Sequence, residues 1–299
     1  MNNHDYLVPE ARALLDLSAE HRANRMLAER FIKHERINPI LDHIRFLRYR
    51  PHQSRASGLV VTGKPGSGKT MLAKSVLREF PASPATATEP ASRPVIMISM
   101  TGAREARTLY NRLLMELGCP NVSNYLGSDR ERMALKLCRA AGVCLLIVDE
   151  IQDILTSTPR QQRIALDTIK FLMNELSLPI LVLGTPQAKI AMELDEHLNA
   201  RFEYRDLPVW DRDDYLVTFL DTLESRLPLK RRSHLSSVPI MTALVKLSNG
   251  ILDPIVKAVC YAAAHAVETG AEQITLELIE RARREPPVAA ARFVEGKAA

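Results

Sequence analysis

The spacing of hydrophobic residues changes at about residue 58, and from there it predicts buried strands that alternate with helices. Four short apolar runs lie at residues 59–62, 95–100, 143–148 and 180–183. Their consecutive Val, Ile and Leu residues are typical of strands buried on both faces of a parallel sheet. Helical spacing follows or separates the runs, at residues 70–80, 104–117, 129–141 and 161–176. This alternation predicts an α/β domain over residues 58–207, with right-handed connections between parallel strands.

The segments on either side of this domain have helical spacing only. Residues 1–57 are polar and rich in Arg, and their apolar positions recur every three or four residues, which predicts a helical N-terminal arm. Residues 208–285 contain no further strand pattern and predict a small helical domain. The Ala- and Pro-rich residues 286–299 are expected to be a disordered tail.

Composition narrows the class of protein without identifying it. The 299 residues are 46% hydrophobic and 25% charged, which excludes a disordered chain, a collagen-like fibre and a disulfide scaffold. The net charge of +5 is a weak indication of nucleic-acid binding, because such an excess is common in other proteins. The four cysteines form no CxxC pair, which argues against a zinc site. No secretory signal is recognisable, and the apolar runs are shorter than the ~20 residues that span a bilayer, so we expect a cytoplasmic protein that does not enter the membrane.

The first apolar run leads directly into a phosphate-binding loop of the form GxxxxGK[ST]. The loop and the first residue after it are Gly63, Lys64, Pro65, Gly66, Ser67, Gly68, Lys69, Thr70 and Met71. Glycines allow successive backbone N–H groups to turn toward phosphate oxygens, and the N-terminus of the following helix adds partial positive charge. Lys69 can reach the β- and γ-phosphates, and the hydroxyl of Thr70 is placed to bind Mg²⁺. The complete motif between a strand and a helix therefore predicts a nucleotide-binding site.

The third apolar run ends in two carboxylates, Asp149 and Glu150. Ligands bind at the carboxyl ends of strands in a parallel sheet, so both side chains are expected beside the phosphate loop. Asp149 is expected to hold Mg²⁺, directly or through a water molecule, and Glu150 to orient and polarise the attacking water. A single acid would support nucleotide binding only, whereas the pair argues for hydrolysis.

Two further positions are candidates for the hydrolytic machinery. The fourth run leads into Thr185, which is expected to contact the γ-phosphate or the attacking water, or to cap a helix that begins at Pro186. Arg201, which we favour over Arg205, is a candidate arginine finger that stabilises charge on the phosphoryl group bound by a neighbouring subunit. The alternative is an ion pair with a local carboxylate such as Glu203 or Asp206.

Together these motifs resemble the AAA+ ATPases, and within them the TniB/TnsC group of transposition ATPases, whose wider relatives include the MuB-type target-selection proteins. The resemblance covers residues 27–284. The closer likeness lies in residues 31–51 with 54–56, in Gly68–Met71 with Lys74 and Phe80, and in Asp149–Ile154 with Leu183–Pro186. One departure is the stretch of residues 248–254, where many AAA+ lids carry a nucleotide-sensing arginine and this chain has none, although Lys257 is nearby.

The resemblance implies an AAA+ P-loop core with an N-terminal helical segment and a C-terminal helical lid, and ATP with Mg²⁺ as the cofactors. It also implies a ring or filament that assembles on duplex DNA of any sequence when ATP is bound, with the arginine finger acting in trans. Such an assembly recruits a DDE transposase, and ATP hydrolysis promotes its disassembly. Related ATPases often contact DNA through the helix after the second strand, which makes Arg104 and Arg107 candidates here. Their alternative role is a solvated helix face paired with Glu105 and other acids.

Three other functions fit parts of the pattern. A secretion-associated ATPase of the ExeA-like type would be expected to carry a membrane segment or a peptidoglycan-binding domain after the lid. A helicase loader would need a helicase-binding N-terminus, for which residues 1–57 leave room. An adaptor that binds ATP without hydrolysing it is disfavoured by Glu150.

Overall fold

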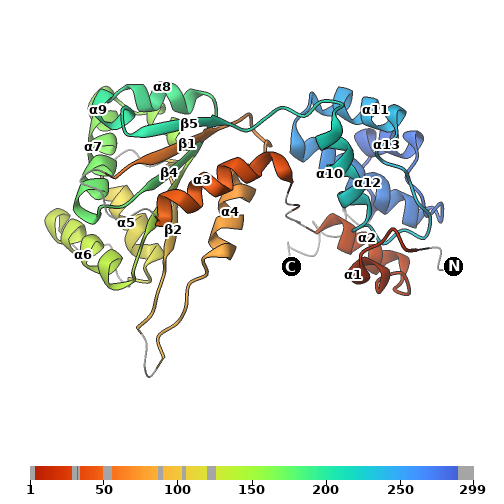
Figure 1. Cartoon of the computed structure of the whole chain (residues 1–299), viewed down its shortest axis with the longest axis horizontal. Coiled ribbons are helices and arrows are strands. Elements are labelled where there is room, and N and C mark those ends of the chain that lie inside the picture. Colours follow the sequence, from red (N-terminus) through yellow and green to blue (C-terminus); the bar gives the residue numbers. More distant parts are fainter. Residues whose placement is uncertain are drawn as a thin grey trace. The chain divides into compact units, whose positions relative to one another are not determined.

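The computed structural model describes residues 4–28, 32, 34–49, 56–86, 90–102, 106–119 and 126–288. The chain divides into two compact units, one formed by Ile37–Leu207 and the other by Met1–Arg36 together with Pro208–Ala299 (Figure 1). The first contains a parallel sheet and is called the α/β unit. The second is built from helices and is called the helical unit.

Five parallel strands form the sheet of the α/β unit, in the order β2-β3-β4-β1-β5. Their bounds are β1 (Gly58–Thr62), β2 (Val95–Ser99), β3 (Leu145–Asp149), β4 (Ile180–Gly184) and β5 (Phe202–Asp206). Every residue of β1, β3 and β4 is buried, as the unbroken apolar runs predict. The predicted α/β fold is therefore confirmed.

The sequence pattern did not indicate β5. This strand lies at the edge of the sheet, where only Phe202 is buried, and the other four residues are polar or half-exposed. Its partner β1 begins with Gly58, whose missing side chain makes room for the ring of Phe202 and for the carbonyl oxygen of Ile180. A Cβ at Gly58 would lie 2.2 Å from that ring and 2.7 Å from that oxygen.

Helices flank this sheet (Figure 1). They are α3 (Asn38–Tyr49), α4 (Lys69–Glu79), α5 (Ala106–Glu116), α6 (Gly127–Ala140), α7 (Pro159–Leu176), α8 (Gln187–Glu193) and α9 (Glu196–Asn199). Between α4 and β2, residues 81–86 and 90–94 extend away from the sheet, and Ser83 and Ser92 pair through two backbone hydrogen bonds of 2.8 and 2.9 Å. Among the described residues, no helix is long and apolar enough to cross a membrane.

The helical unit contains six α-helices in the described part of the chain. They are α1 (Pro9–Arg12), α2 (Ala19–Leu27), α10 (Asp214–Glu224), α11 (Val238–Ser248), α12 (Leu252–Glu268) and α13 (Leu276–Arg284). Side chains cap α10 and α13 at Asp213 and Thr275, and the left-handed residue Asn249 ends α11. The predicted C-terminal helices are thus present.

The segment expected as an N-terminal arm is divided between the two units. Helix α3 covers the α/β unit with four buried apolar residues, whereas α2 packs on α12 in the helical unit. Ala23 of α2 and Ala264 of α12 are both completely buried against each other, so the two helices approach closely. Helical spacing shows that such a segment has an apolar face, but it does not show which partner covers that face. The described part of the chain ends at Val288, so most of the expected tail lies outside it.

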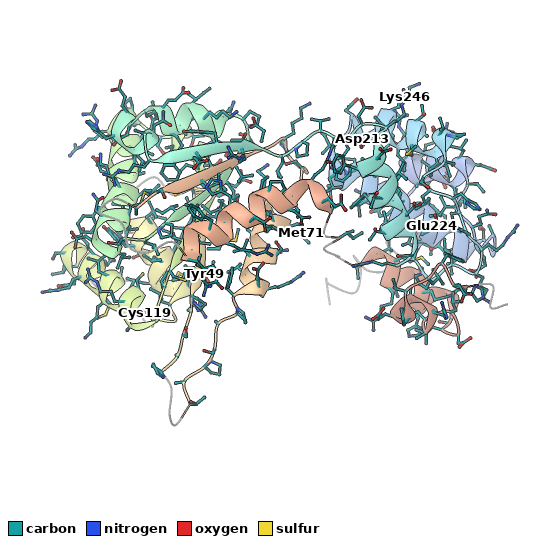
Figure 2. All side chains as sticks on the ribbon, in the orientation of Figure 1. Tyr49, Met71, Cys119, Asp213, Glu224 and Lys246 are labelled. Carbon is teal, nitrogen blue, oxygen red and sulfur yellow. The ribbon has the colours of Figure 1, made fainter. Side chains whose placement is uncertain are left out.

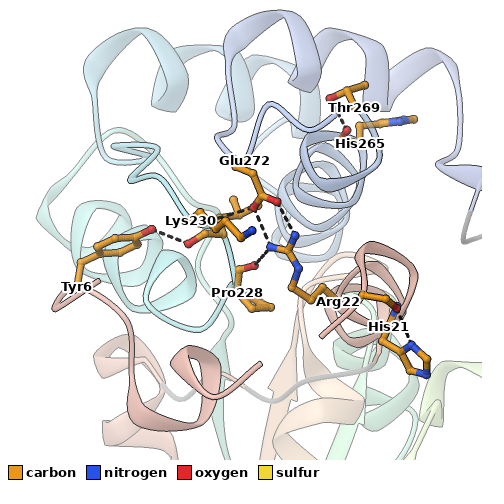
Figure 3. A network of polar contacts seen from close by, with 10 residues as sticks. Tyr6, His21, Arg22, Pro228, Lys230, His265, Thr269 and Glu272 are labelled. Atoms are coloured by element: carbon orange, nitrogen blue, oxygen red, sulfur yellow. Dashed lines mark hydrogen bonds and ion pairs between the residues drawn. The ribbon is translucent and has the colours of Figure 1, made fainter. Parts of the chain in front are cut away.

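A buried ion pair joins α2 to the C-terminal helices (Figure 3). The guanidinium of Arg22, 5% exposed, donates two hydrogen bonds to the carboxylate of Glu272 and one of 3.0 Å to the carbonyl of Pro228. The backbone N–H of Lys230 donates to the same carboxylate at 3.2 Å. Both terminal nitrogens of Arg22 and both carboxylate oxygens of Glu272 therefore have partners, although the buried Nε of Arg22 has none among the described residues. Such pairing reduces the penalty for burying opposite charges.

Replacing Arg22 is expected to destabilise the helical unit. An Arg22→Met substitution leaves the carboxylate of Glu272 buried without its cation, at a cost of about 3–5 kcal/mol in the free energy of unfolding. The only tryptophan, Trp210, is 3% exposed within this unit, so its fluorescence during urea unfolding measures the loss. Arg12→Met is the matched control, because Arg12 forms an exposed pair with Asp5 and should cost under about 1 kcal/mol.

The same pair gives a pH dependence with a defined sign. Burial raises the pKa of Glu272, but hydrogen bonds from Arg22 and from the N–H of Lys230 outweigh burial and leave the pKa below its usual 4.5. A carboxylate with a lowered pKa stabilises the fold above its unfolded pKa and loses that contribution as the pH falls. The difference in stability between wild type and Arg22→Met should therefore shrink below about pH 4.5. A difference that is constant down to pH 3 would contradict this account.

Candidate active site

The phosphate loop connects the carboxyl end of β1 to the first residue of α4. Gly66 and Gly68 adopt left-handed backbone conformations, with φ of 76° and 97°, that side chains would strain. A Cβ at Gly63 would lie 2.4 Å from the hydroxyl of Ser67 and 3.1 Å from the Cβ of Leu207, so a larger residue here would displace the Ser67 side chain. Lys64, Pro65 and Gly66 are exposed, so the loop is accessible to a ligand. Met71, labelled in Figure 2, follows in the first turn of α4.

Lys69 is held over the phosphate loop by the loop itself. The side chain is 6% exposed, and its Nζ donates to the carbonyl oxygens of Gly63 at 2.8 Å and Lys64 at 3.2 Å. Burial lowers the pKa of Lys69, against the opposing effect of the carboxylates of Glu150 and Asp149. A buried ammonium whose nearest partners are neutral carbonyls favours an anion beside it, which suits a phosphate group.

Thr70 and Asp149 bring two oxygen ligands together beside this lysine. The hydroxyl Oγ1 of Thr70 lies 3.4 Å from Oδ2 of Asp149, which is 5% exposed. Burial raises the pKa of Asp149, opposed first by the hydrogen bond of 2.9 Å from the N–H of Glu150. A hydroxyl and one carboxylate fit Mg²⁺, which keeps several water molecules and takes its other ligands from phosphates. In the described ranges there is no cluster of three or more His, Cys, Asp or Glu side chains that would suit another metal.

Glu150 lies next to Asp149 in an unusual backbone conformation. Its φ of 56° is in the left-handed region, which is uncommon for residues other than glycine. Its carboxylate accepts a hydrogen bond from the side-chain amide of Gln152, in the short helix η3 (Ile151–Thr156). Gln152 did not emerge as a site residue from the sequence. Its position two residues after the Asp-Glu pair was visible there, but the neighbours of its side chain were not.

Thr185 follows β4 and faces the same edge of the sheet. Its N–H donates to Oε1 of Gln152 at 3.0 Å. Its hydroxyl is buried and has no hydrogen-bond partner among the described residues. The alternative of a helix cap is wrong, because α8 has Pro186 at its N-cap position and no side-chain cap. A buried hydroxyl without a partner is costly, so it is a candidate contact for a ligand.

The two arginine candidates occupy different ends of the edge strand β5. Gly58 pairs with Phe202, and Thr62 pairs with Asp206. Arg201 therefore lies at the amino ends of the strands, whereas the phosphate loop lies at their carboxyl ends. Arg201 is level with residue 57, six residues before Gly63, so at about 3.3 Å per residue the two are roughly 20 Å apart along the strand direction. Arg201 donates to the side-chain oxygen of Asn174 at 2.6 Å, whereas Arg205 pairs with Glu203 at 3.2 Å. The local ion pair considered for these arginines therefore applies to Arg205.

The candidate DNA contacts lie at the start of α5. Arg107 is exposed in its first turn and makes no ion pair with another described residue, while Arg104 and Glu105 lie outside the described residues. From the same helix, the guanidinium of Arg112 donates to the carbonyl oxygens of Ser99 and Thr101. Arg112 thus fixes the chain just after β2.

In the helical unit, residues 248–254 contain no arginine, as the sequence indicates. Nearby, the Nζ of Lys257 lies 5.3 Å from the ring centroid of Tyr261 on α12. An exposed lysine over an aromatic ring is stabilised in place without an acidic partner.

Comparison with known proteins gives both a family match and several structural matches. A sequence model of the family described as "Bacterial TniB protein" matches residues 22–212, more than half of the chain. No curated protein is a significant match. The fold is similar to that of the Aeropyrum pernix ORC2 protein in ADPNP–ADP complexes, with a TM-score of 0.63 and 18% identity, over 88% of this chain and 71% of that one.

Two further solved structures are similar to a comparable extent. Cdc6p from Pyrobaculum aerophilum has a TM-score of 0.64 and 13% identity, over 89% of this chain and 71% of that one. The Aeropyrum pernix ORC1 protein in complex with DNA has a TM-score of 0.60 and 16% identity, over 88% of this chain and 68% of that one. At this level of identity the likeness shows the fold, which is that of the AAA+ proteins.

The geometry around Asp149 predicts that its substitution weakens ATP binding only when Mg²⁺ is present. Asp149→Asn keeps the shape of the side chain but removes the charge that would hold Mg²⁺, so ATP affinity in the presence of Mg²⁺ should fall at least about tenfold. Affinity measured in EDTA should change little, because Lys69 and the loop remain. Asp153→Asn, three residues into η3, is the control. Equal loss with and without Mg²⁺ would show that Asp149 supports the fold of the loop instead of a metal.

Proposed function

The chain belongs to the TniB family of bacterial proteins, and on that premise we propose that it is an ATP-dependent regulator of DNA transposition. In this proposal it binds ATP and Mg²⁺, assembles on duplex DNA of any sequence, recruits a DDE transposase to that DNA, and hydrolyses ATP to disassemble. One observation carries the ATPase part. A complete phosphate loop lies against two acidic residues at the end of β3, with Thr70 and Asp149 3.4 Å apart.

Each residue of the site has a role in the proposed hydrolysis. The loop Gly63–Thr70 binds the phosphates through its N–H groups, and the ammonium of Lys69 exchanges its carbonyl partners for phosphate oxygens. Thr70 and Asp149 hold Mg²⁺, which supplies charge neutralisation for the transferring phosphoryl group. Glu150 orients the attacking water and accepts its proton. The unpartnered hydroxyl of Thr185 donates to the γ-phosphate or to that water.

Assembly follows from the position proposed for the arginine finger. Arg201 lies at the amino ends of the strands, away from the phosphate loop of its own subunit, so its guanidinium would serve a nucleotide bound by a neighbouring subunit. It has no carboxylate partner in the described chain, only the amide oxygen of Asn174, which a phosphate would readily displace. Hydrolysis would then require contact between subunits, in a ring or filament.

DNA binding is proposed through phosphate contacts made by basic side chains on each subunit. Arg107 is the described candidate, exposed at the start of α5 and free of ion pairs within the described residues. Such contacts do not read sequence, and their strength adds over the subunits of an assembly. A net charge of only +5 is compatible with this mode, because a few arginines repeated along the DNA supply the attraction.

The proposed function predicts that ATP controls binding to DNA. The protein should sediment with duplex DNA of unrelated sequences when ATP and Mg²⁺ are present, and binding should weaken steeply as salt rises. Arg107→Glu should weaken binding several-fold, whereas Arg163→Glu on α7 serves as a control for the change of charge. DNA binding that is indifferent to ATP would overturn the transposition proposal and favour a helicase-loading or secretion-associated ATPase.

Mixing two inactive variants tests whether Arg201 acts in trans. Arg201→Ala retains the phosphate loop, and Lys69→Ala retains the arginine. Mixed assemblies therefore contain some complete sites, and they should regain ATPase activity that neither variant has alone. The measurement is phosphate release at a fixed total subunit concentration, with each variant alone as the reference. Absence of rescue in oligomers shown to contain both variants would exclude Arg201 as the finger.

A further inference from the structure

The side-chain amide of Gln152 connects the ends of two neighbouring strands in the α/β unit. Its Nε2 donates to the carboxylate of Glu150, which follows β3, and its Oε1 accepts from the N–H of Thr185, which follows β4. We propose that Gln152 is a positioning residue that couples the strand tip at Thr185 to the carboxylate of Glu150. This inference rests on the proposed ATPase function, in which Thr185 senses the phosphate and Glu150 activates water.

The chemistry of the three groups allows only one orientation of this amide. An ionised carboxylate can only accept hydrogen bonds, and a backbone N–H can only donate. The NH₂ group of Gln152 must therefore face Glu150, and its oxygen must face Thr185. Rotation of the amide by 180° would break both contacts at once, so a change at either partner is transmitted to the other.

Close packing holds the amide in this place. Gln152 is 9% exposed. Gly184 lies beside it, and a Cβ there would come within 2.5 Å of Oε1 of Gln152 and 2.7 Å of the Cβ of Ala188. The glycine at the end of β4 thus creates the space that the amide fills. A buried amide whose two ends both have partners is rigid and costly to displace.

Glu150 has a strained backbone, and its carboxylate accepts the hydrogen bond from Gln152. A φ of 56° is strained for a residue with a side chain and persists only where its surroundings enforce it. The charged groups that interact with Glu150 are Lys69 and Asp149, on α4 and β3. The contact from η3 comes from the neutral Gln152, which directs one carboxylate oxygen without adding charge.

Through these contacts the amide of Gln152 would transmit a movement of Thr185 to Glu150. The hydroxyl of Thr185 has no partner in the described chain, while its N–H is held by Gln152. A phosphate that attracts the hydroxyl would shift the Thr185 peptide, and the amide would carry that shift to Glu150. Placement errors of about 1 Å in a catalytic group can cost about a hundredfold in rate, so this coupling is large enough to control hydrolysis.

Two substitutions separate the contacts. Gln152→Met keeps the length of the side chain and removes both hydrogen bonds. Gln152→Glu keeps an oxygen for the N–H of Thr185 but replaces the donor to Glu150 with a second carboxylate. Gln161→Glu is the matched control, since Gln161 stands in the capping box of α7, where Glu serves equally well. The measurements are ATP affinity with a fluorescent analogue, kcat, and thermal stability.

The proposal predicts that both Gln152 variants lower kcat at least tenfold and change ATP affinity less than about threefold. The expected signature of a positioning residue is therefore a loss of kcat without a matching loss of ATP affinity or thermal stability. A merely structural role would lower all three together.

The outcomes distinguish this inference from the function on which it rests. Wild-type protein that neither binds nor hydrolyses ATP would overturn both. An active wild type, an inactive Glu150→Gln and unchanged kcat in both Gln152 variants would overturn the coupling alone. Parallel losses of kcat, ATP affinity and thermal stability would also overturn it, because they would assign Gln152 to the fold.

Discussion

The hydrogen-bond register among β3, β4 and β1 fixes the relative position of every residue in the candidate site. Val148 pairs with Val182, and Thr62 pairs with Gly184, so the three strands end at the same edge of the sheet. The phosphate loop, the Asp-Glu pair and Thr185 each begin within two residues of those ends. A shift of one residue in any of the three strands would turn its buried side chains to the other face and separate these groups.

Burial at the carboxyl ends of the strands opposes the charged forms of two site residues. Burial lowers the pKa of Lys69 and raises the pKa of Asp149. The two residues reduce that cost by their mutual attraction, and the lysine adds carbonyl partners from its own loop. A polyphosphate bound with Mg²⁺ brings an anion to the lysine and a cation to the aspartate, which meets both needs at once.

The helical unit depends on a different kind of constraint. Its N-terminal and C-terminal parts are far apart in sequence, and small residues at Ala23 and Ala264 allow α2 and α12 to pack closely. The pair between Arg22 and Glu272 adds specificity to that packing, because each charge is acceptable in the interior only when the other is present. Helix α2 is therefore part of this unit, in spite of the α/β unit that separates it from α12 along the chain.

By itself, the sequence determined the α/β class, four of the five strands, the phosphate loop and the acidic pair, because these depend on local spacing and on motifs of adjacent residues. The burial of β2 was overestimated, because this strand lies at the edge of the sheet and Met97 and Ser99 are only half-buried. Only the tertiary structure decided what depends on neighbours distant in sequence. Strand β5 forms because β1 offers an edge to a polar segment, and residues 1–36 join the C-terminal helices because α12 covers α2. Gln152 joins Glu150 to Thr185 because β3 and β4 are adjacent, although Thr185 lies 33 residues further along the chain. Hydrophobic spacing reports which face of a segment is buried, whereas the partner that buries it is chosen by packing in three dimensions.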